Sequence, residues 1–300
     1  MISLSEVPHP IDNSDKSQTN IDKRIDYRFL DTRNMKKQAI FKIRSKITKT
    51  LTNFFDSNGF TNIQTPKMTT IGVESGADLF TVDYFGKPIY LSQSPQIYKQ
   101  MFVIGGFERV YEIAPVFRAE KSHTSRHLTE FTGVDFEMAF IKDENELMDF
   151  VEEMLIDLLT KLKEESSSEL ELLEVDHKIP EDIPRITMAE AKALLAEKGK
   201  KYSDEDDLDP EGEKLLGEIV KEKYGSEFVF LTNFPFAVRP FYVMKPEEDS
   251  NGTKSFDLLF NGVEIATGAQ REHQLEILEK QAKGKGLDLD KMPEYKDLFK

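Results

Sequence analysis

The pattern of apolar positions along the chain predicts a mixture of helices and short strands. Over residues 35–58 the apolar side chains recur every three or four positions, which is the spacing of one helix face. Strand-like stretches follow at 109–118 and 131–141, and the pair Asn261-Gly262 between two apolar runs is a strong hairpin signal. Antiparallel strands interrupted by helices predict an α+β domain.

Shorter elements are predicted between the long helix and the first long strand. Residues 60–65 and 90–92 have the composition of short strands, and Ser94 followed by proline is typical of a helix start. On the helix that follows, Gln96 and Lys99 are three residues apart, so we expect them to share one face.

Charge and composition divide the chain into a linker and a domain that contains an acidic segment. Residues 1–34 are polar and show no sustained period, so they are predicted to be a linker, and residues 35–300 are predicted to form one domain. The formal net charge of the 300 residues is −15, and residues 141–230 alone hold 27 acidic and 12 basic side chains. We therefore expect an acidic helical insertion at 143–227, and the remainder of the chain is electrically balanced and can face phosphates.

Composition also excludes several kinds of protein. The sequence has no cysteine, which excludes a disulfide framework and thiolate metal sites, and no two of its five histidines have zinc-site spacing. The N-terminal residues lack the basic start and apolar core of a signal peptide, and no apolar run has the length of a membrane span. A cytosolic protein without a membrane segment is the expectation.

One group of residues has the chemistry of a nucleotide site. On paired strands, Arg118 and Glu120 are predicted to point one way, and Phe131, Asp135 and Glu137 lie on one face of the return strand. A guanidinium binds a carboxylate or phosphate through two parallel hydrogen bonds, and an aromatic ring beside it stacks on a flat base. An Arg/Glu pair on a sheet is usually a plain salt bridge, but the neighbouring acids make a binding site the better interpretation.

Other candidates flank this group. A carboxylate at Glu74 suits a substrate ammonium group, and a cation at Lys99 suits a substrate carboxylate. Glu264 and Thr267 offer two oxygen ligands for a hard cation such as Mg²⁺. Because these two residues have opposite strand parity, both reach one ion only if the backbone bulges near Gly268.

Six segments carry a resemblance to a known family: 59–66, 74–80, 93–100, 116–140, 238–242 and 268–271. They resemble the catalytic domain of class II aminoacyl-tRNA synthetases, and most of all the cytosolic aspartyl-tRNA synthetases of the eukaryotic and archaeal type. The resemblance implies an antiparallel sheet flanked by helices and a homodimer that works in protein biosynthesis. It also implies an aspartate-tRNA ligase, which uses ATP and Mg²⁺ to convert L-aspartate to aspartyl-adenylate and transfers the aspartyl group to tRNA(Asp).

The resemblance also implies roles for single residues. Arg118 is the implied catalytic residue, because it would hold both the α-phosphate and the α-carboxylate. The residues implied for aspartate are Glu74, Gln96, Lys99, Arg118, Asp135 and Arg271. Those implied for ATP are Arg118, Glu120, Arg126, His127, Leu128, Phe131 and Glu264. Glu264 and Thr267 are implied for the metal, with threonine where the family usually has serine, and Pro66 is implied for the dimer interface.

Two alternatives stay open at this point. An asparaginyl enzyme shares the fold, but two cations at Lys99 and Arg271 match a carboxylate better than a neutral amide. The family's third motif should follow residues 295–300, and its anticodon-binding barrel should precede residue 1, so we expect a fold truncated before that motif. The second alternative is therefore a fragment or a non-catalytic relative that acts as a binding module. In either case, the loop 120–130 is the candidate surface for the tRNA acceptor end.

Overall fold

The computed structural model describes residues 7–12, 19–70, 79–120, 128–246 and 251–300. The chain divides into two compact units. The first contains Met1–Phe54 and Met154–Ile179, and the second contains Phe55–Glu153 and Pro180–Lys300.

Helices make up the regular structure described in the first unit. They are α1 (Ile21–Asp26), α2 (Arg28–Asp31), α6 (Ser167–Leu172), most of α3 (Met35–Ser57) and the second half of α5 (Glu144–Glu165). The apolar pattern predicted α3, and α5 lies within the acidic helical insertion predicted at 143–227, but α1 and α2 were not predicted. Polar contacts stabilise these two short helices, because Asn20 accepts a hydrogen bond from the Asp22 amide at 2.9 Å and the buried Asp31 carboxylate pairs with Arg24 at 2.8 Å.

The acidic segment is partly neutralised within this unit. Three lysines of α3 pair with glutamates of α5, α6 and the turn after α6: Lys46 with Glu165, Lys42 with Glu169 and Lys36 with Glu174. These pairs are exposed, so solvent screens them and each contributes little to stability.

The second unit is built around the sheet β1-β5-β6, in which the long strands β5 (Arg109–Phe117) and β6 (Glu130–Met138) are antiparallel. Strand β1 (Thr61–Asn62) pairs in parallel with β5 and is shorter than the predicted strand at 60–65. Beyond the strand, the amide of Thr65 donates to the side-chain carboxylate of Glu112 on β5 at 2.7 Å and not to a backbone carbonyl, so the ladder does not continue.

An aromatic cluster forms the core against this sheet. Phe55 stacks on the fully buried Tyr111 with 4.6 Å between ring centroids, and Phe60, Phe136 and Phe150 surround Phe55 at 5.2 to 6.3 Å. Aromatic pairs at these separations add to the free energy of burial, so the cluster fixes the sheet on the end of α3.

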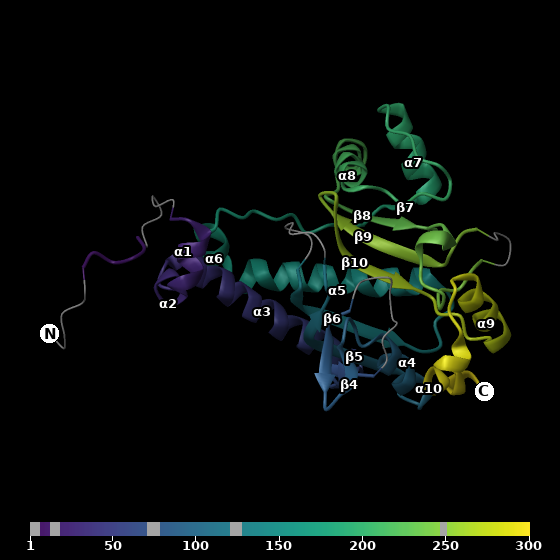
Figure 1. Ribbon diagram of the computed structural model, residues 1–300. Helices are drawn as coiled ribbons and strands as arrows, with labels where there is room; N and C mark the ends of the chain where they lie inside the picture. Colours follow the sequence, from purple (N-terminus) through teal and green to yellow (C-terminus); the bar gives the residue numbers. More distant parts are fainter. Residues whose placement is uncertain (1–6, 13–18, 71–78, 121–127, 247–250) are drawn as a thin grey trace. The chain divides into compact units, whose positions relative to one another are not determined.

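Two further sheets complete the unit. One has the order β2-β4-β3 and contains Met68–Thr69, Lys87–Leu91 and Thr81–Tyr84. The other has the order β10-β9-β8-β7 and contains Val263–Ala269, Ser255–Phe260, Phe228–Thr232 and Arg185–Thr187. Helices α7 (Met188–Glu197) and α8 (Pro210–Tyr224) pack against the second of these sheets through a shared apolar core (Figure 1).

The remaining helices surround the binding residues described below. They are α4 (Gln96–Ile104), α9 (Leu275–Gly284), α10 (Pro293–Lys296) and three 3₁₀ turns at Phe236–Val238, Leu289–Lys291 and Asp297–Phe299. Ile97 of α4, Leu278 of α9 and Tyr295 of α10 meet in one buried cluster. None of the helices in the described part of the chain combines the length and apolar character that a membrane span requires.

The predicted α+β class is confirmed, since most strand pairs are antiparallel and only β1–β5 and β7–β8 are parallel among the described residues. Two local predictions differ in detail. Strand β5 ends at Phe117, so Arg118 lies just beyond the strand, and α4 begins at Gln96 with Pro95 in the capping position. The Ser94 hydroxyl still accepts a hydrogen bond from the Gln96 amide at 3.2 Å, so the serine caps the helix from the residue before the capping position.

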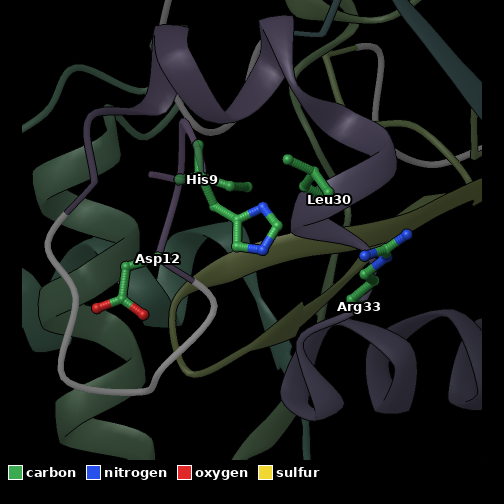
Figure 2. A pocket seen from close by; sticks show the side chains of 5 residues that line it. His9, Asp12, Leu30 and Arg33 are labelled. Atoms are coloured by element: carbon green, nitrogen blue, oxygen red, sulfur yellow. The ribbon is translucent and has the colours of Figure 1, made fainter. Parts of the chain in front are cut away.

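A cavity lies in the first unit, apart from the predicted chemistry. Its volume is about 320 Å³, and its lining residues are His9, Ile11, Asp12, Leu30 and Arg33 (Figure 2). None of the predicted site residues lines this cavity, because all of them belong to the second unit.

The predicted hairpin at Asn261-Gly262 is confirmed, and a helix packs directly on its turn. Both residues have positive φ angles, +48° and +74°, as this two-residue turn requires. A Cβ atom on Gly262 would lie 2.5 Å from the carbonyl oxygen of Glu213 in α8, and a Cβ atom on Gly217 would lie 2.6 Å from the Gly262 nitrogen. The two glycines therefore allow α8 to approach the hairpin.

We expect Gly262→Ala to lower the free energy of unfolding by about 3 kcal/mol or more, because the new methyl group meets backbone atoms as well as an unfavourable φ. Gly199→Ala is the matched control, since Gly199 has φ +88° and no atom beyond its chain neighbours lies within 4 Å of the position that the new methyl carbon would take. Its cost should be about 1–2 kcal/mol from φ alone. Urea denaturation measures both, and equal losses would contradict the close-approach explanation.

Candidate active site

The pairing of β5 with β6 places the predicted return-strand residues on one face. In the register, Val116 lies opposite Phe131 and Glu112 lies opposite Asp135. Phe131, Asp135 and Glu137 alternate along β6, so their side chains share a face, as the sequence predicted. The sheet thus aligns an aromatic ring and two carboxylates along one strand.

Four charged side chains meet on this face. Lys99 of α4 pairs with Asp135, and its Nζ lies 3.3 Å from Glu137 Oε2. Arg271, which follows β10, donates from Nε to Glu137 Oε1 at 3.0 Å and from Nη2 to Glu137 Oε2 at 3.2 Å. The Arg271 Nη2 also donates to Gln96 Oε1 at 3.1 Å. The structure therefore brings together the predicted residues Gln96, Lys99, Asp135 and Arg271.

Burial makes the charges of this cluster depend on one another. The side chains of Lys99 and Glu137 are only 8% and 9% exposed. Burial acts to lower the pKa of Lys99, but Asp135 and Glu137 outweigh it, and the pKa is raised above its ordinary value. Burial acts to raise the pKa of Glu137, but Arg271 and Lys99 outweigh it, and the pKa is lowered. Lys99 and Glu137 are thus both charged near neutral pH.

Arg118 and Phe131 form the adjoining part of the site. The Arg118 guanidinium lies 5.3 Å from the centroid of the Phe131 ring, and the Arg118 amide donates to the carbonyl of Thr129 at 3.0 Å. Arg118 is exposed, so its charge is accessible to a ligand. The guanidinium can bind a phosphate, and the flat ring beside it can stack on a base.

The predicted metal residues lie on the β9–β10 hairpin. A bulge interrupts the pairing between Glu264 and Ala266, so Glu264 lies opposite Leu259 and Thr267 lies opposite Asp257. Because Leu259 and Asp257 share a face of β9, Glu264 and Thr267 share a face as well. The bulge that the sequence required is present, but it lies at Ile265 and not near Gly268. Ile265 is exposed, so leaving it unpaired disturbs no core contact.

The hairpin face also holds a carboxylate and a guanidinium with no predicted role there. Asp257 is buried, and its Oδ2 lies 2.7 Å from the Arg239 Nη2. Its Oδ1 has no hydrogen-bond partner among the described residues. Desolvation of its carboxyl group and the nearby Asp257 raise the pKa of Glu264 above its ordinary value, while Arg239 acts against them. The residue as a whole still has exposed surface, so solvent screens part of this effect.

These residues suit a divalent cation bound partly by phosphates. Asp257, Glu264 and Thr267 supply oxygen atoms, and the free Oδ1 of a buried carboxylate is an acceptor that lacks a donor. No cluster of three or more His, Cys, Asp or Glu side chains with metal-binding geometry occurs in the described ranges. The set therefore resembles the sparse oxygen sites of Mg²⁺, which keeps water or phosphate ligands, more than a closed metal cage.

Several predicted residues are not placed with this site. Glu74, Arg126 and His127 lie outside the described residues. Glu120 is half-buried shortly after Arg118, whereas Leu128 and Pro66 are exposed. For these residues the predicted roles stay predictions.

Sequence reasoning placed Glu137 on the binding face by its strand parity but gave it no ligand, and it assigned no role to Asp257 or Arg239. For Asp257 the signal was weaker, because its position opposite Thr267 depends on the bulge. Arg239 belonged to a noted segment, but only the fold brings it to the hairpin.

Comparisons with known proteins identify the family of this chain. Residues 20–300 match the family described as "tRNA synthetases class II (D, K and N)". The aspartate–tRNA(Asp) ligase of Pyrococcus horikoshii is 43% identical over 289 residues, which cover 96% of this chain and 66% of that protein. The structure of an aspartyl-tRNA synthetase from Entamoeba histolytica superposes with a TM-score of 0.85 at 35% identity and covers 96% of this chain and 56% of that one.

An asparaginyl enzyme is similar as well. The structure of asparaginyl-tRNA synthetase from P. horikoshii, complexed with asparaginyl-adenylate, gives a TM-score of 0.87 at 31% identity and covers 94% of this chain and 65% of that one. The chain belongs to the class II tRNA synthetase family for aspartate, lysine and asparagine, and the predicted fold class is thereby confirmed. It spans about two thirds of the length of the P. horikoshii ligase.

We expect Glu137→Gln to destabilise the fold at pH 7 by about 3–5 kcal/mol, because Lys99 and Arg271 lose the anion that both contact. The lowered pKa of Glu137 means that its carboxylate stabilises the fold above the ordinary value of 4.5 and that this contribution disappears as the pH falls through the folded value. The difference between the variant and the parent chain should therefore shrink on acidification.

Urea denaturation at several pH values from 7 downward measures this difference. Glu153→Gln, at an exposed position of α5, is the matched control and should change the stability by less than about 0.5 kcal/mol. A stability difference for Glu137→Gln that stays constant with pH would show that the effect is not electrostatic.

Proposed function

We propose that this chain carries the aspartate-activating site of an aspartate–tRNA ligase. Two cations, Lys99 and Arg271, that contact the acids on the face of β6 carry the proposal. Arg118, beside Phe131 of the same strand, is the candidate for binding phosphate. The name of the P. horikoshii relative supports the choice of amino acid. Members of the class II family use ATP, and the ring of Phe131 next to Arg118 suits an adenine.

The proposed reaction has two steps. In the first, an oxygen of the aspartate α-carboxylate attacks the α-phosphorus of ATP, the bond from that phosphorus to the pyrophosphate breaks, and aspartyl-adenylate forms. Arg118 would stabilise the negative charge that gathers on the phosphoryl oxygens. In the second step, a ribose hydroxyl of the tRNA attacks the aspartyl carbonyl carbon and gives up its proton, and AMP leaves with the electrons of the broken bond.

The charged cluster would select the amino acid. Arg271 uses Nε and Nη2 for Glu137 and Gln96, which leaves Nη1 for the side-chain carboxylate of a substrate. Lys99 adds a second positive charge, while Asp135 is more exposed and would face the substrate ammonium group. A neutral asparagine side chain would offer the two cations no compensating charge.

Asp257, Glu264 and Thr267 would hold Mg²⁺. When bound, this ion neutralises phosphate charge and helps to orient the pyrophosphate leaving group. The residues of this chain then have separate tasks: the hairpin face supplies the oxygen ligands, and Arg118 supplies the fixed positive charge.

The other predictions remain proposals. We infer that tRNA(Asp) and L-aspartate are the substrates and that the protein acts in the cytosol as a homodimer. The exposed position of Pro66 is compatible with an interface role. The non-catalytic alternative has no specific support, because the described part of the site keeps its cations and acids assembled.

ATP–pyrophosphate exchange tests the proposal directly. We expect the chain to catalyse exchange that depends on aspartate and not on asparagine, and Arg118→Ala to reduce the rate about 10²–10³-fold. Lys198→Ala, which changes an exposed cation of the second unit, should leave the rate unchanged. Folded protein that gives no exchange with either amino acid would contradict catalysis by this chain.

Lys99→Gln tests the choice of amino acid. Removing this charge should raise the KM for aspartate at least about 30-fold and the KM for asparagine far less, because only aspartate has a charged side chain that the Lys99 ammonium can bind. The comparison uses exchange kinetics with both amino acids on protein whose circular dichroism matches the parent. Equal losses for the two substrates would contradict the assignment of Lys99 to the side-chain carboxylate.

A further inference from the structure

Arg239 is a buried cation with no role in the proposed reaction. It follows the 3₁₀ turn Phe236–Val238, and its side chain is 13% exposed. Its guanidinium lies 3.6 Å from the centroid of the Phe234 ring, which is a stacking distance. A fully buried ring thus fixes one face of the guanidinium.

The edge of this guanidinium spans the β9–β10 hairpin. Nη2 lies 2.7 Å from Asp257 Oδ2, and Nη1 donates to the Thr267 hydroxyl at 3.3 Å. Asp257 and Thr267 are directly opposite in the register. Arg239 therefore contacts two of the three residues that we propose for Mg²⁺.

The contact with Asp257 has an unusual form. Although the atoms are 2.7 Å apart, Arg239 Nη2 and Nε make no aligned hydrogen bond with any described residue. The attraction is therefore mainly between the two charges and has little direction. An ion pair without aligned hydrogen bonds is more easily replaced by another cation than a bidentate pair is.

The charges of the hairpin face explain why a cation is needed there. Asp257 and Glu264 share one face of the hairpin, and the Arg239 guanidinium lies 2.7 Å from Asp257. Its positive charge offsets the repulsion between the two carboxyl groups. Without Arg239 this face would be more negative by one charge, which would favour a divalent ion.

We propose that Arg239 is a placeholder cation, which holds Asp257 and Thr267 in position until a divalent ion binds and which competes with that ion for them. This inference rests on the metal site of the proposed function and extends it. A guanidinium stays charged at every pH at which the protein folds, so the competition has to end by movement of the side chain and not by loss of a proton.

Competition between Arg239 and the metal ion sets the order of binding. While Arg239 neutralises Asp257, the protein alone attracts a divalent ion only weakly. The phosphates of ATP bring further negative charge to the same face, so they favour the ion and offer the guanidinium another partner. We therefore expect tight metal binding only together with the nucleotide.

Two variants of Arg239 separate its charge from its hydrogen bonds. Arg239→Gln keeps a donor but removes the charge, and Arg239→Lys keeps the charge. Titration of Mn²⁺ without nucleotide, followed by electron paramagnetic resonance, gives the dissociation constant for each. We expect Arg239→Gln to bind Mn²⁺ at least about fivefold more tightly than the parent chain and Arg239→Lys to stay within about twofold.

The failures of the two proposals are distinguishable. When added to Arg239→Gln, Asp257→Asn and Glu264→Gln should each weaken Mn²⁺ binding. Unchanged binding in both double variants would overturn the metal site itself. If these variants weaken binding but Arg239→Gln binds no more tightly than the parent, the metal site stands and the placeholder role is overturned.

A measurement on the unmodified side chain covers the case in which Arg239→Gln does not fold. In ¹⁵N-labelled protein, the Nε–H resonance of Arg239, assigned by its loss in Arg239→Lys, should shift when Mg²⁺ and a non-hydrolysable ATP analogue are added together. It should move little with Mg²⁺ alone at the same concentration. A resonance that is unchanged in both conditions would overturn the proposal.

Discussion

The buried ionic cluster of Lys99, Glu137 and Arg271 is the constraint on which the second unit depends. A buried charge is tolerated only when it is paired and hydrogen-bonded, and here one carboxylate serves two cations from segments that are distant in sequence. Helix α4, strand β6 and the segment after β10 therefore have to meet in one geometry. In the proposed function Lys99 and Arg271 also select the substrate, so the same atoms would meet the requirements of folding and of selectivity.

The β9–β10 hairpin shows how a local irregularity produces a site. Without the unpaired Ile265, Glu264 and Thr267 would point to opposite faces of the hairpin, and Thr267 would not lie opposite Asp257. The glycine at the turn allows α8 to pack against the hairpin end, which fixes the strands on which these oxygens stand. The arrangement brings two acids together, and Arg239 offsets part of their repulsion in the absence of a metal ion.

Sequence reasoning anticipated the elements with strong periodic or turn signals. It predicted α3, β5, β6 and the Asn261-Gly262 hairpin, because each has an apolar period or turn chemistry of its own. It missed α1 and α2, which depend on the Asn20 cap and on ion pairs to Asp31 in a polar segment that has no apolar period. It also missed the early end of β1, where Thr65 bonds to the side chain of Glu112, a residue distant in the sequence.

The sequence by itself determined the α+β class, the family resemblance and most of the residues that form the site, since motif spacing and strand parity are properties of the chain. Only the tertiary structure decided that Glu137 is the shared partner of Lys99 and Arg271, and that Arg239 lies against Asp257 and Thr267. Each of these contacts joins residues on different elements. Their distances follow from how helices and sheets pack, which the order of residues does not express locally.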